Sequence, residues 1–266
     1  MTINNNLKEK RNMLLTEVKE FCFRNNVNTF FLGGSLATEN ADKFSDIDFR
    51  VVLKEDESKN EFLEHFLNEI HSKIAFIETL TSFCAVVHFS DFVKLDLFVY
   101  YPNELAANVW LKDILILQDN QKILQFLKNE SSKMDYFVKE EELENYLIKY
   151  TSYLHELYRR SKRKEYNYCE HCTLMMKHIL VSLWLIENGD IPNDLGDWSK
   201  YEGSRSSLNL RQQKFSDTFT PINFKDISTF VYSMNREILN TGKNISRNME
   251  FHLNIETYSS LFDLRF

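Results

Sequence analysis

The chain has 266 residues, enough for one large or two modest domains. Hydrophobic residues make up 43% and charged residues 27%, which is an ordinary globular balance. The net charge of −7 argues against a protein that binds nucleic acid by neutralising its phosphates, and it suits a small cationic ligand. Four scattered cysteines argue against a disulfide scaffold.

The chain start and the hydropathy pattern bear on location. The first seven residues lack the basic and apolar regions of a signal peptide. We find no run of about 18 apolar residues, the length that a membrane span needs. We therefore expect a cytoplasmic protein without membrane or nucleic-acid partners.

Helical and strand patterns alternate over the first half of the chain. Leu14, Val18 and Phe21 share one helical face, for example, whereas alternation in the segment that follows Asp46 is typical of a strand. We expect helices over 7–24, from Ser35, over 57–74 and over 121–127, and strands over 28–32, 46–54, 82–89, 93–101 and 113–117.

From about residue 135 the pattern becomes helical, and we place the domain boundary near 130–138, at the segment Lys128–Lys133. Leu143, Leu147 and Leu154 recur at helical spacing, and Gly189 is placed to end a helix. We expect helices over 140–160, 167–188, 224–239 and 249–262, with an irregular segment over 192–207.

The segment Gly33-Gly34-Ser35 is followed about ten residues later by Asp46-Ile47-Asp48. Residues i and i+2 of a strand point the same way, so the two carboxylates project together. Aspartate is disfavoured in strands, and paired carboxylates repel each other unless a cation lies between them. Mg²⁺ is commonly held by such carboxylates together with substrate phosphates. The pattern therefore favours metal-assisted phosphoryl or nucleotidyl transfer over two merely exposed charges.

These motifs resemble the signature of the nucleotidyltransferase superfamily that includes DNA polymerase beta. Leu32–Ser35 matches its glycine turn, Asp46–Phe49 its paired carboxylates, and Asp96 its third carboxylate on a later strand. The chain looks most similar to lincosamide and aminoglycoside antibiotic nucleotidyltransferases, with Asp42–Phe49 and Arg163–Tyr166 close to the lincosamide branch. The specific motifs lie within about the first hundred residues.

The resemblance implies an α+β nucleotidyltransferase domain over 1–133, with a mixed sheet flanked by helices. It implies an all-α helical-bundle domain over 134–266 that binds the acceptor. The implied reaction moves AMP from ATP to a hydroxyl of a lincosamide or aminoglycoside and releases pyrophosphate, with two Mg²⁺ ions as cofactors. Relatives often pair, so a homodimer is also implied as possible.

The resemblance also assigns roles to individual residues. Asp46, Asp48 and Asp96 form the expected catalytic and metal-binding set, in which Asp96 is either a ligand or the general base. The expected nucleotide-binding residues are Gly33, Gly34, Ser35, Lys43 and Ser45. Many relatives carry Arg or Lys just after the glycine turn, whereas Leu36–Asn40 has neither. The residue that neutralises the triphosphate therefore stays open.

Three further features admit more than one interpretation. Cys169 and Cys172 have the spacing of half a zinc site, but the single pair on an apolar helix favours buried thiols. Glu170 and Glu202 are candidate acceptor contacts or a base, although solvated surface glutamates are at least as good an explanation. For the chain as a whole, a protein-adenylylating enzyme and an inactive nucleotide-binding module of the same fold stay as alternatives.

Overall fold

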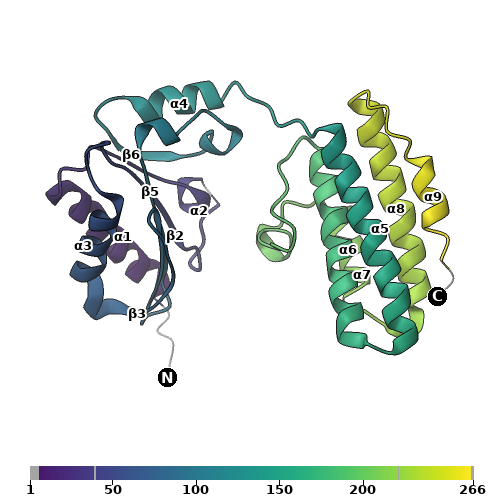
Figure 1. Ribbon diagram of the computed structural model, residues 1–266. Coiled ribbons are helices and arrows are strands. Elements are labelled where there is room, and N and C mark those ends of the chain that lie inside the picture. The colour runs from purple at the N-terminus through teal and green to yellow at the C-terminus, as the bar shows by residue number, and fades with distance from the viewer. Residues whose placement is uncertain (1–5, 39, 221, 265–266) are drawn as a thin grey trace. The chain divides into compact units, whose positions relative to one another are not determined.

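The computed structural model describes residues 6–38, 40–220 and 222–264 (Figure 1). The chain divides into two compact units, Met1–Asp135 and Tyr136–Phe266. The first combines a sheet with helices, and the second is helical. The α+β fold followed by a helical region, as expected from the sequence, is confirmed. Among the described residues, no helix is both long and apolar enough to cross a membrane.

The first unit is built on one six-stranded sheet with the order β3-β4-β5-β2-β1-β6. The β2–β5 pair is parallel and the other neighbouring pairs are antiparallel, so the sheet is mixed. The strands are β1 (Thr29–Leu32), β2 (Ile47–Val52), β3 (Ile74–Leu80), β4 (Cys84–Phe89), β5 (Lys94–Tyr100) and β6 (Leu115–Asp119).

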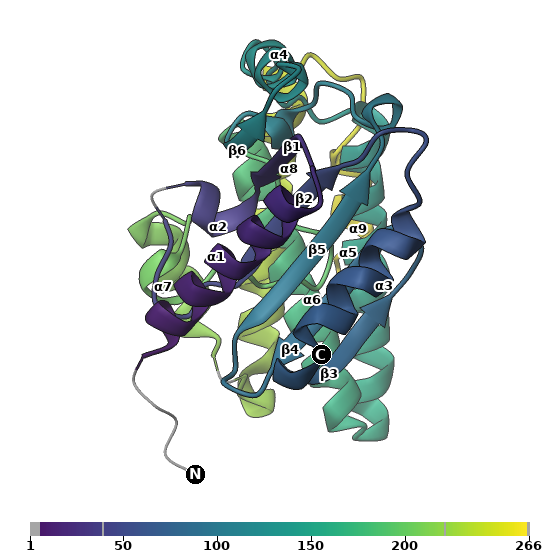
Figure 2. The same ribbon diagram turned by 90° about the vertical axis from the view of Figure 1, so that its left-hand side faces the viewer.

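Helices α1 (Leu7–Arg24) and α3 (Lys59–Ile70) cover one face of this sheet (Figures 1 and 2). Their apolar side chains pack against alternate residues of the two central strands, among them Phe49 of β2 and Leu97 of β5, which are fully buried. Because strand side chains alternate, the residues between these point to the opposite face. That opposite face carries the charged side chains of both strands.

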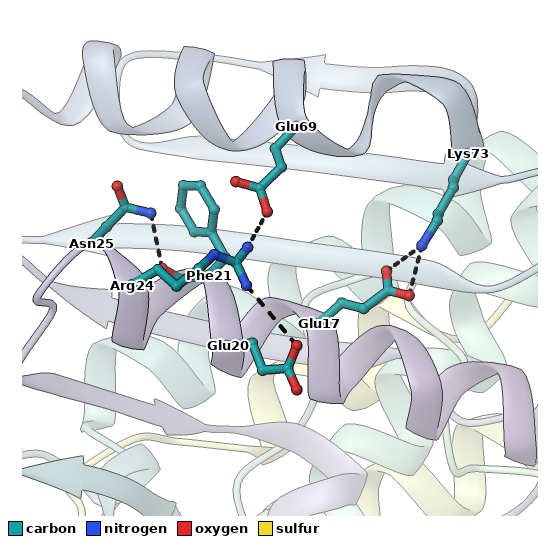
Figure 3. Close-up of polar contacts among 7 residues, drawn as sticks. All are labelled: Glu17, Glu20, Phe21, Arg24, Asn25, Glu69 and Lys73. Atoms are coloured by element: carbon teal, nitrogen blue, oxygen red, sulfur yellow. Dashed lines mark hydrogen bonds and ion pairs between the residues drawn. The ribbon is translucent and has the colours of Figure 1, made fainter.

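Ion pairs at the rim of this layer link α1 to α3 and to the short 3₁₀-helix η1 (His71–Lys73) that follows it (Figure 3). Arg24 pairs with Glu69, and the Lys73 ammonium lies 2.6 Å from the Glu17 carboxylate. These side chains are a third to a half exposed, so such pairs stabilise the fold only weakly.

A smaller core lies at the β1–β6 end of the sheet, where α4 (Ile123–Ser131) and the 3₁₀-helix η3 (Val109–Leu111) pack. Phe31 and Val52 belong to it, and both lie on the sheet face opposite α1 and α3. The one-turn helix α2 (Gly34–Ala37) follows β1, and the 3₁₀-helix η2 (Pro102–Glu104) follows β5.

The second unit packs around α6 (Tyr166–Glu187), whose residues from Met175 to Ile186 are all buried. Helix α5 (Glu140–Arg163) contributes a stripe of leucines to the same core. Gly189 follows α6 with a φ of +81°, the conformation expected for a glycine that ends a helix. The remaining helices are α7 (Leu210–Thr218), α8 (Ile227–Asn248) and α9 (Glu256–Leu261), with 3₁₀-turns η4 (Gly203–Arg205) and η5 (Phe224–Asp226).

Some expected boundaries were wrong. The helix expected over 57–74 ends at Ile70, and β3 begins at Ile74. Strand β3 was not predicted from the sequence. All but its first residue are exposed, so its side chains show no alternation between buried and exposed positions. Helix α7 was not expected, α8 runs on to Asn248, and the helix expected over 249–262 shrinks to α9.

Candidate active site

The glycine turn after β1 lies directly over the β2 carboxylate. The Gly33 N–H donates a hydrogen bond to the Asp48 carbonyl oxygen at 3.0 Å. Gly34 has a φ of +60°, and a Cβ at this position would lie 1.9 Å from Asp48 Oδ2. Only glycine lets the backbone pass so close to the carboxylate in this conformation. The position of the Asp48 carboxylate therefore depends on the close packing of the glycine turn against β2.

Three carboxylates meet on the sheet face opposite α1 and α3. Asp48 of β2 and Asp96 of β5 are direct partners in the parallel pairing, so they lie side by side. Asp46 precedes Asp48 by two residues and belongs to the same face. Their side chains are 40%, 21% and 17% exposed for Asp46, Asp48 and Asp96, respectively. The three carboxylates predicted from the sequence thus occur together.

Two basic side chains of the same two strands partly neutralise this cluster. The Lys94 ammonium lies 2.9 Å from Asp96 Oδ2 and 3.6 Å from Asp46 Oδ2. Arg50 Nη2 lies 3.5 Å from Asp48 Oδ1, and the guanidinium packs over the Phe98 ring at 4.3 Å. Two cations therefore face three anions in a partly buried setting.

The pKa values reflect this crowding. Burial raises the pKa of Asp48, and the negative charges of Asp46 and Asp96 add to the rise while Arg50 and Lys94 oppose it. Burial lowers the pKa of Lys94, but its hydrogen bond to Asp96 and the surrounding carboxylates outweigh burial, and the net shift is upward. The cluster therefore favours an additional positive charge beside Asp48 and a protonated Lys94.

The cluster fits a divalent cation in the type and placement of its donors. Asp96 Oδ1 is buried and has no hydrogen-bond partner among the described residues, although buried polar atoms are normally paired. Carboxylate oxygens are the ligands that Mg²⁺ prefers. As the side chains stand, however, no group of three acidic, histidine or cysteine side chains in the described ranges is arranged as a ready metal site.

Of the other expected nucleotide-binding residues, Ser35 and Ser45 are buried, whereas Lys43 is exposed. Ser35 is buried in α2, directly after the glycine turn. Ser45 is buried too, and its hydroxyl accepts a hydrogen bond from the Asp42 backbone N–H and donates one to the Asp42 carboxylate. Arg11 donates hydrogen bonds to the backbone carbonyl oxygens of Asp42 and Ser45 in the same loop. Lys43 is exposed and lies over the Phe44 ring at 4.8 Å. Ser45 thus shapes the loop before β2.

The sequence reasoning missed Arg50 and Lys94 as members of the site. A Cβ on Gly33 would lie 3.9 Å from Arg50 Nη2, so the guanidinium sits beside the glycine turn. Arg50 Nη1 is buried without a hydrogen-bond partner in the described part of the chain. The signal was present, since Arg50 and Lys94 each lie two residues from a carboxylate of the cluster, on the same strand face.

In the second unit, the cysteine pair lies within α6. Cys169 and Cys172 are both free and buried within α6, and burial raises the pKa of both thiols, that of Cys172 to about 12. A structural zinc would need thiolates and two more ligands. The expectation of buried thiols is confirmed. Glu170 and Glu202 are exposed, on α6 and at the start of η4.

Comparison with known proteins assigns the class. The family model of the nucleotidyltransferase domain matches residues 16–166, which include the glycine turn, both carboxylate strands and the loop before β2. The chain belongs to this family and is a nucleotidyltransferase enzyme.

Two further comparisons add less. No curated protein matches the chain significantly. Among solved structures, the chain is similar to an aminoglycoside 6-adenyltransferase from Bacillus subtilis, with 12% identity over 89% of this chain and 90% of that one. The TM-score of this match is 0.44, so it carries no inference about substrate.

Proposed function

We propose that the protein is a Mg²⁺-dependent adenylyltransferase that moves AMP from ATP to a hydroxyl of a small molecule and releases pyrophosphate. The observation that carries this proposal is the pairing of Asp48 with Asp96 in adjacent parallel strands, with Asp46 on the same face, inside the family-matched segment. A buried carboxylate oxygen of Asp96, which has no hydrogen-bond partner in the described part of the chain, supports a cation ligand at this place.

Each residue of the cluster has a proposed role. Asp46 and Asp48 hold Mg²⁺, which when bound neutralises charge on the α-phosphate as the acceptor oxygen attacks in line. Asp96 either completes the ligand set or accepts the proton of the acceptor hydroxyl. The bond formed joins the acceptor oxygen to the α-phosphorus, and the bond broken releases pyrophosphate.

The nucleotide phosphates are proposed to lie along the glycine turn. Gly33 and Gly34 allow close approach of the backbone, and Ser35 offers a hydroxyl. Lys43 and Ser45 belong to the loop that flanks the site. Arg50, beside Gly33, supplies a fixed positive charge for the phosphate tail, a role that the loop after the glycine turn lacks a residue to fill.

The acceptor is proposed to be a lincosamide or an aminoglycoside, and the helical unit is proposed to bind it. The similarity of Asp42–Phe49 to the lincosamide branch supports the first, and the net charge of −7 suits a cationic drug. Glu170 and Glu202 are proposed contacts because both carboxylates are exposed.

A pyrophosphate-release assay tests the proposal. The full chain is incubated with ATP, Mg²⁺ and a panel of lincosamides and aminoglycosides, beside the double variant Asp46→Asn/Asp48→Asn. Turnover with one drug that the double variant lacks establishes the reaction and names the acceptor. If no drug of the panel supports pyrophosphate release, the proposal of an antibiotic acceptor is overturned. Incubation of candidate protein targets with labelled ATP then tests whether the enzyme adenylylates protein. Unchanged acceptor affinity in Glu170→Gln/Glu202→Gln removes those two contacts.

A further inference from the structure

Lys94 occupies a place between two carboxylates that the proposed function assigns to a metal. It lies two residues before Asp96 on β5, so both side chains project from the same sheet face. One ammonium contacts Asp96 Oδ2 at 2.9 Å and approaches Asp46 Oδ2 to 3.6 Å. Lys94 therefore links Asp96 of β5 to Asp46, the residue directly before β2.

We propose that Lys94 is an internal counter-ion that competes with the divalent cation for Asp96 and Asp46, and that its ammonium leaves them when the cation binds. This inference rests on the proposed function, because it takes these carboxylates as the cation ligands.

The geometry makes joint occupancy unfavourable. A Mg²⁺ ligand oxygen lies about 2.1 Å from the ion, so a cation on Asp96 Oδ2 would be only a few ångström from an ammonium held on the same oxygen. Like charges at such a separation repel each other appreciably even in a water-like dielectric. An ion held on Asp96 Oδ1 instead would still be only a few ångström from the ammonium, because both oxygens belong to one carboxylate. Binding of the ion therefore favours departure of the ammonium.

Lys94 can leave, whereas Arg50 is held. The Lys94 side chain is 34% exposed and has a flexible four-carbon stem, so its ammonium can reach water without disturbing the strand. Arg50 is 21% exposed and packs over the Phe98 ring, and it is anchored beside Gly33. Lys94 contacts Asp96 of β5 and Asp46, the residue directly before β2, whereas Arg50 pairs with Asp48.

Without a metal, Lys94 also stabilises the cluster. Three carboxylates that share one face repel one another, and burial already disfavours the charge on Asp48. Removing the Lys94 charge should therefore lower the stability of the metal-free protein and increase its affinity for a cation. A lysine that merely filled space would produce neither change through its charge.

The test is calorimetric titration of Mn²⁺, without nucleotide, into the full-length wild type and Lys94→Met. We expect about tenfold tighter Mn²⁺ binding in the variant, the effect of removing one nearby positive charge. We also expect a lower thermal midpoint in chelator and a larger Mn²⁺-induced rise. The matched control is Lys73→Met, which removes a lysine–glutamate pair at the rim of α1 and should leave Mn²⁺ affinity unchanged (Figure 3).

The outcomes separate the inference from the proposed function. Equal or weaker Mn²⁺ binding by a folded Lys94→Met protein, with binding by the wild type, overturns the counter-ion role alone. Absence of Mn²⁺ binding in both proteins overturns the metal site itself. If Lys94→Met does not fold, Lys94→Gln removes the charge while keeping a hydrogen-bond donor toward Asp96, and the same expectations apply.

Discussion

Both units contain carboxylates that are largely buried, but the groups that surround these carboxylates differ. In the helical unit, Glu237 of α8 is 6% exposed, and its Oε1 accepts hydrogen bonds from Arg211 at 2.6 Å and Trp184 at 3.3 Å. In the sheet unit, Asp48 and Asp96 lie beside each other with like charge. Glu237 has its donors supplied by the fold, while Asp48 and Asp96 belong to a cluster in which three carboxylates face two cations.

The difference separates a carboxylate that is satisfied within the fold from carboxylates that are proposed to hold a cation. A satisfied buried carboxylate links the elements that donate to it, here α6, α7 and α8. A crowded pair with a buried oxygen lacking a partner costs stability, and such a cost persists where a ligand later supplies the missing charge. Mutations in the two places should therefore have opposite signatures.

The largest expected effect is that of Asp48→Asn on nucleotidyl transfer, a loss of about 1000-fold, because the substitution removes one of the proposed cation ligands. The stability of the metal-free protein, in contrast, should not fall with this substitution. Burial raises the pKa of Asp48 in the folded protein, so its stability contribution is present at low pH and lost as pH rises through that pKa. The metal-free variant should therefore be at least as stable as the wild type at neutral pH. Product formation and thermal unfolding in chelator measure both, and a clear loss of stability would contradict the comparison.

Gly34→Ala should reduce transfer by about 100-fold by displacing the carboxylate, because the added Cβ would lie 1.9 Å from Asp48 Oδ2. The left-handed backbone adds a stability loss of about 1–2 kcal/mol. Gly189→Ala is the matched control, since it has a φ of +81° but nothing within 4 Å of its Cβ. It should lose stability alone, and equal transfer by both variants would refute the close packing of turn and carboxylate.

Glu237→Ala should destabilise the protein by about 2–3 kcal/mol, because the buried Trp184 N–H loses its acceptor and a gap remains. Arg211 is 67% exposed and can be rehydrated, which limits the loss. Urea unfolding measures the change. Glu256→Ala, which breaks an exposed pair with Lys243, is the control and should change stability little. Similar midpoints for the two variants would show that Glu237 is not structural.

The smallest expected effect concerns His178, which is fully buried and whose Nε2 contacts the Asp197 carbonyl oxygen at 2.9 Å. Burial lowers its pKa, with the Asp197 hydrogen bond opposing. A depressed folded pKa means that stability is present above the ordinary value of 6.5 and is lost as pH falls toward the folded pKa. The wild type should lose at most about 1.4 kcal/mol per pH unit more than His178→Gln in this window. If the unfolding midpoints of the wild type and His178→Gln changed with pH in parallel, this contribution of His178 to stability would be excluded.

Much of the fold could be predicted, and the failures have physical reasons. Helices α1 and α5 are amphipathic with a buried stripe, so their apolar spacing marked them. Strand β3 lies at the sheet edge with most of its side chains exposed, so no alternation marked it. The segment from Met249 to Asn254 is non-helical although its apolar residues suggested a helix, because Phe251 and Leu253 pack against the core of the second unit without one.

The sequence alone determined that Asp46 and Asp48 project together and that a glycine turn precedes them, because both follow from strand period and local backbone freedom. Only the tertiary structure decided that Asp48 faces Asp96, that Lys94 bridges two carboxylates, and that Arg50 lies beside the turn. These depend on the pairing of β2 with β5, strands that are far apart in the chain. Register between distant strands is set by long-range packing of their inner faces, which no local pattern encodes.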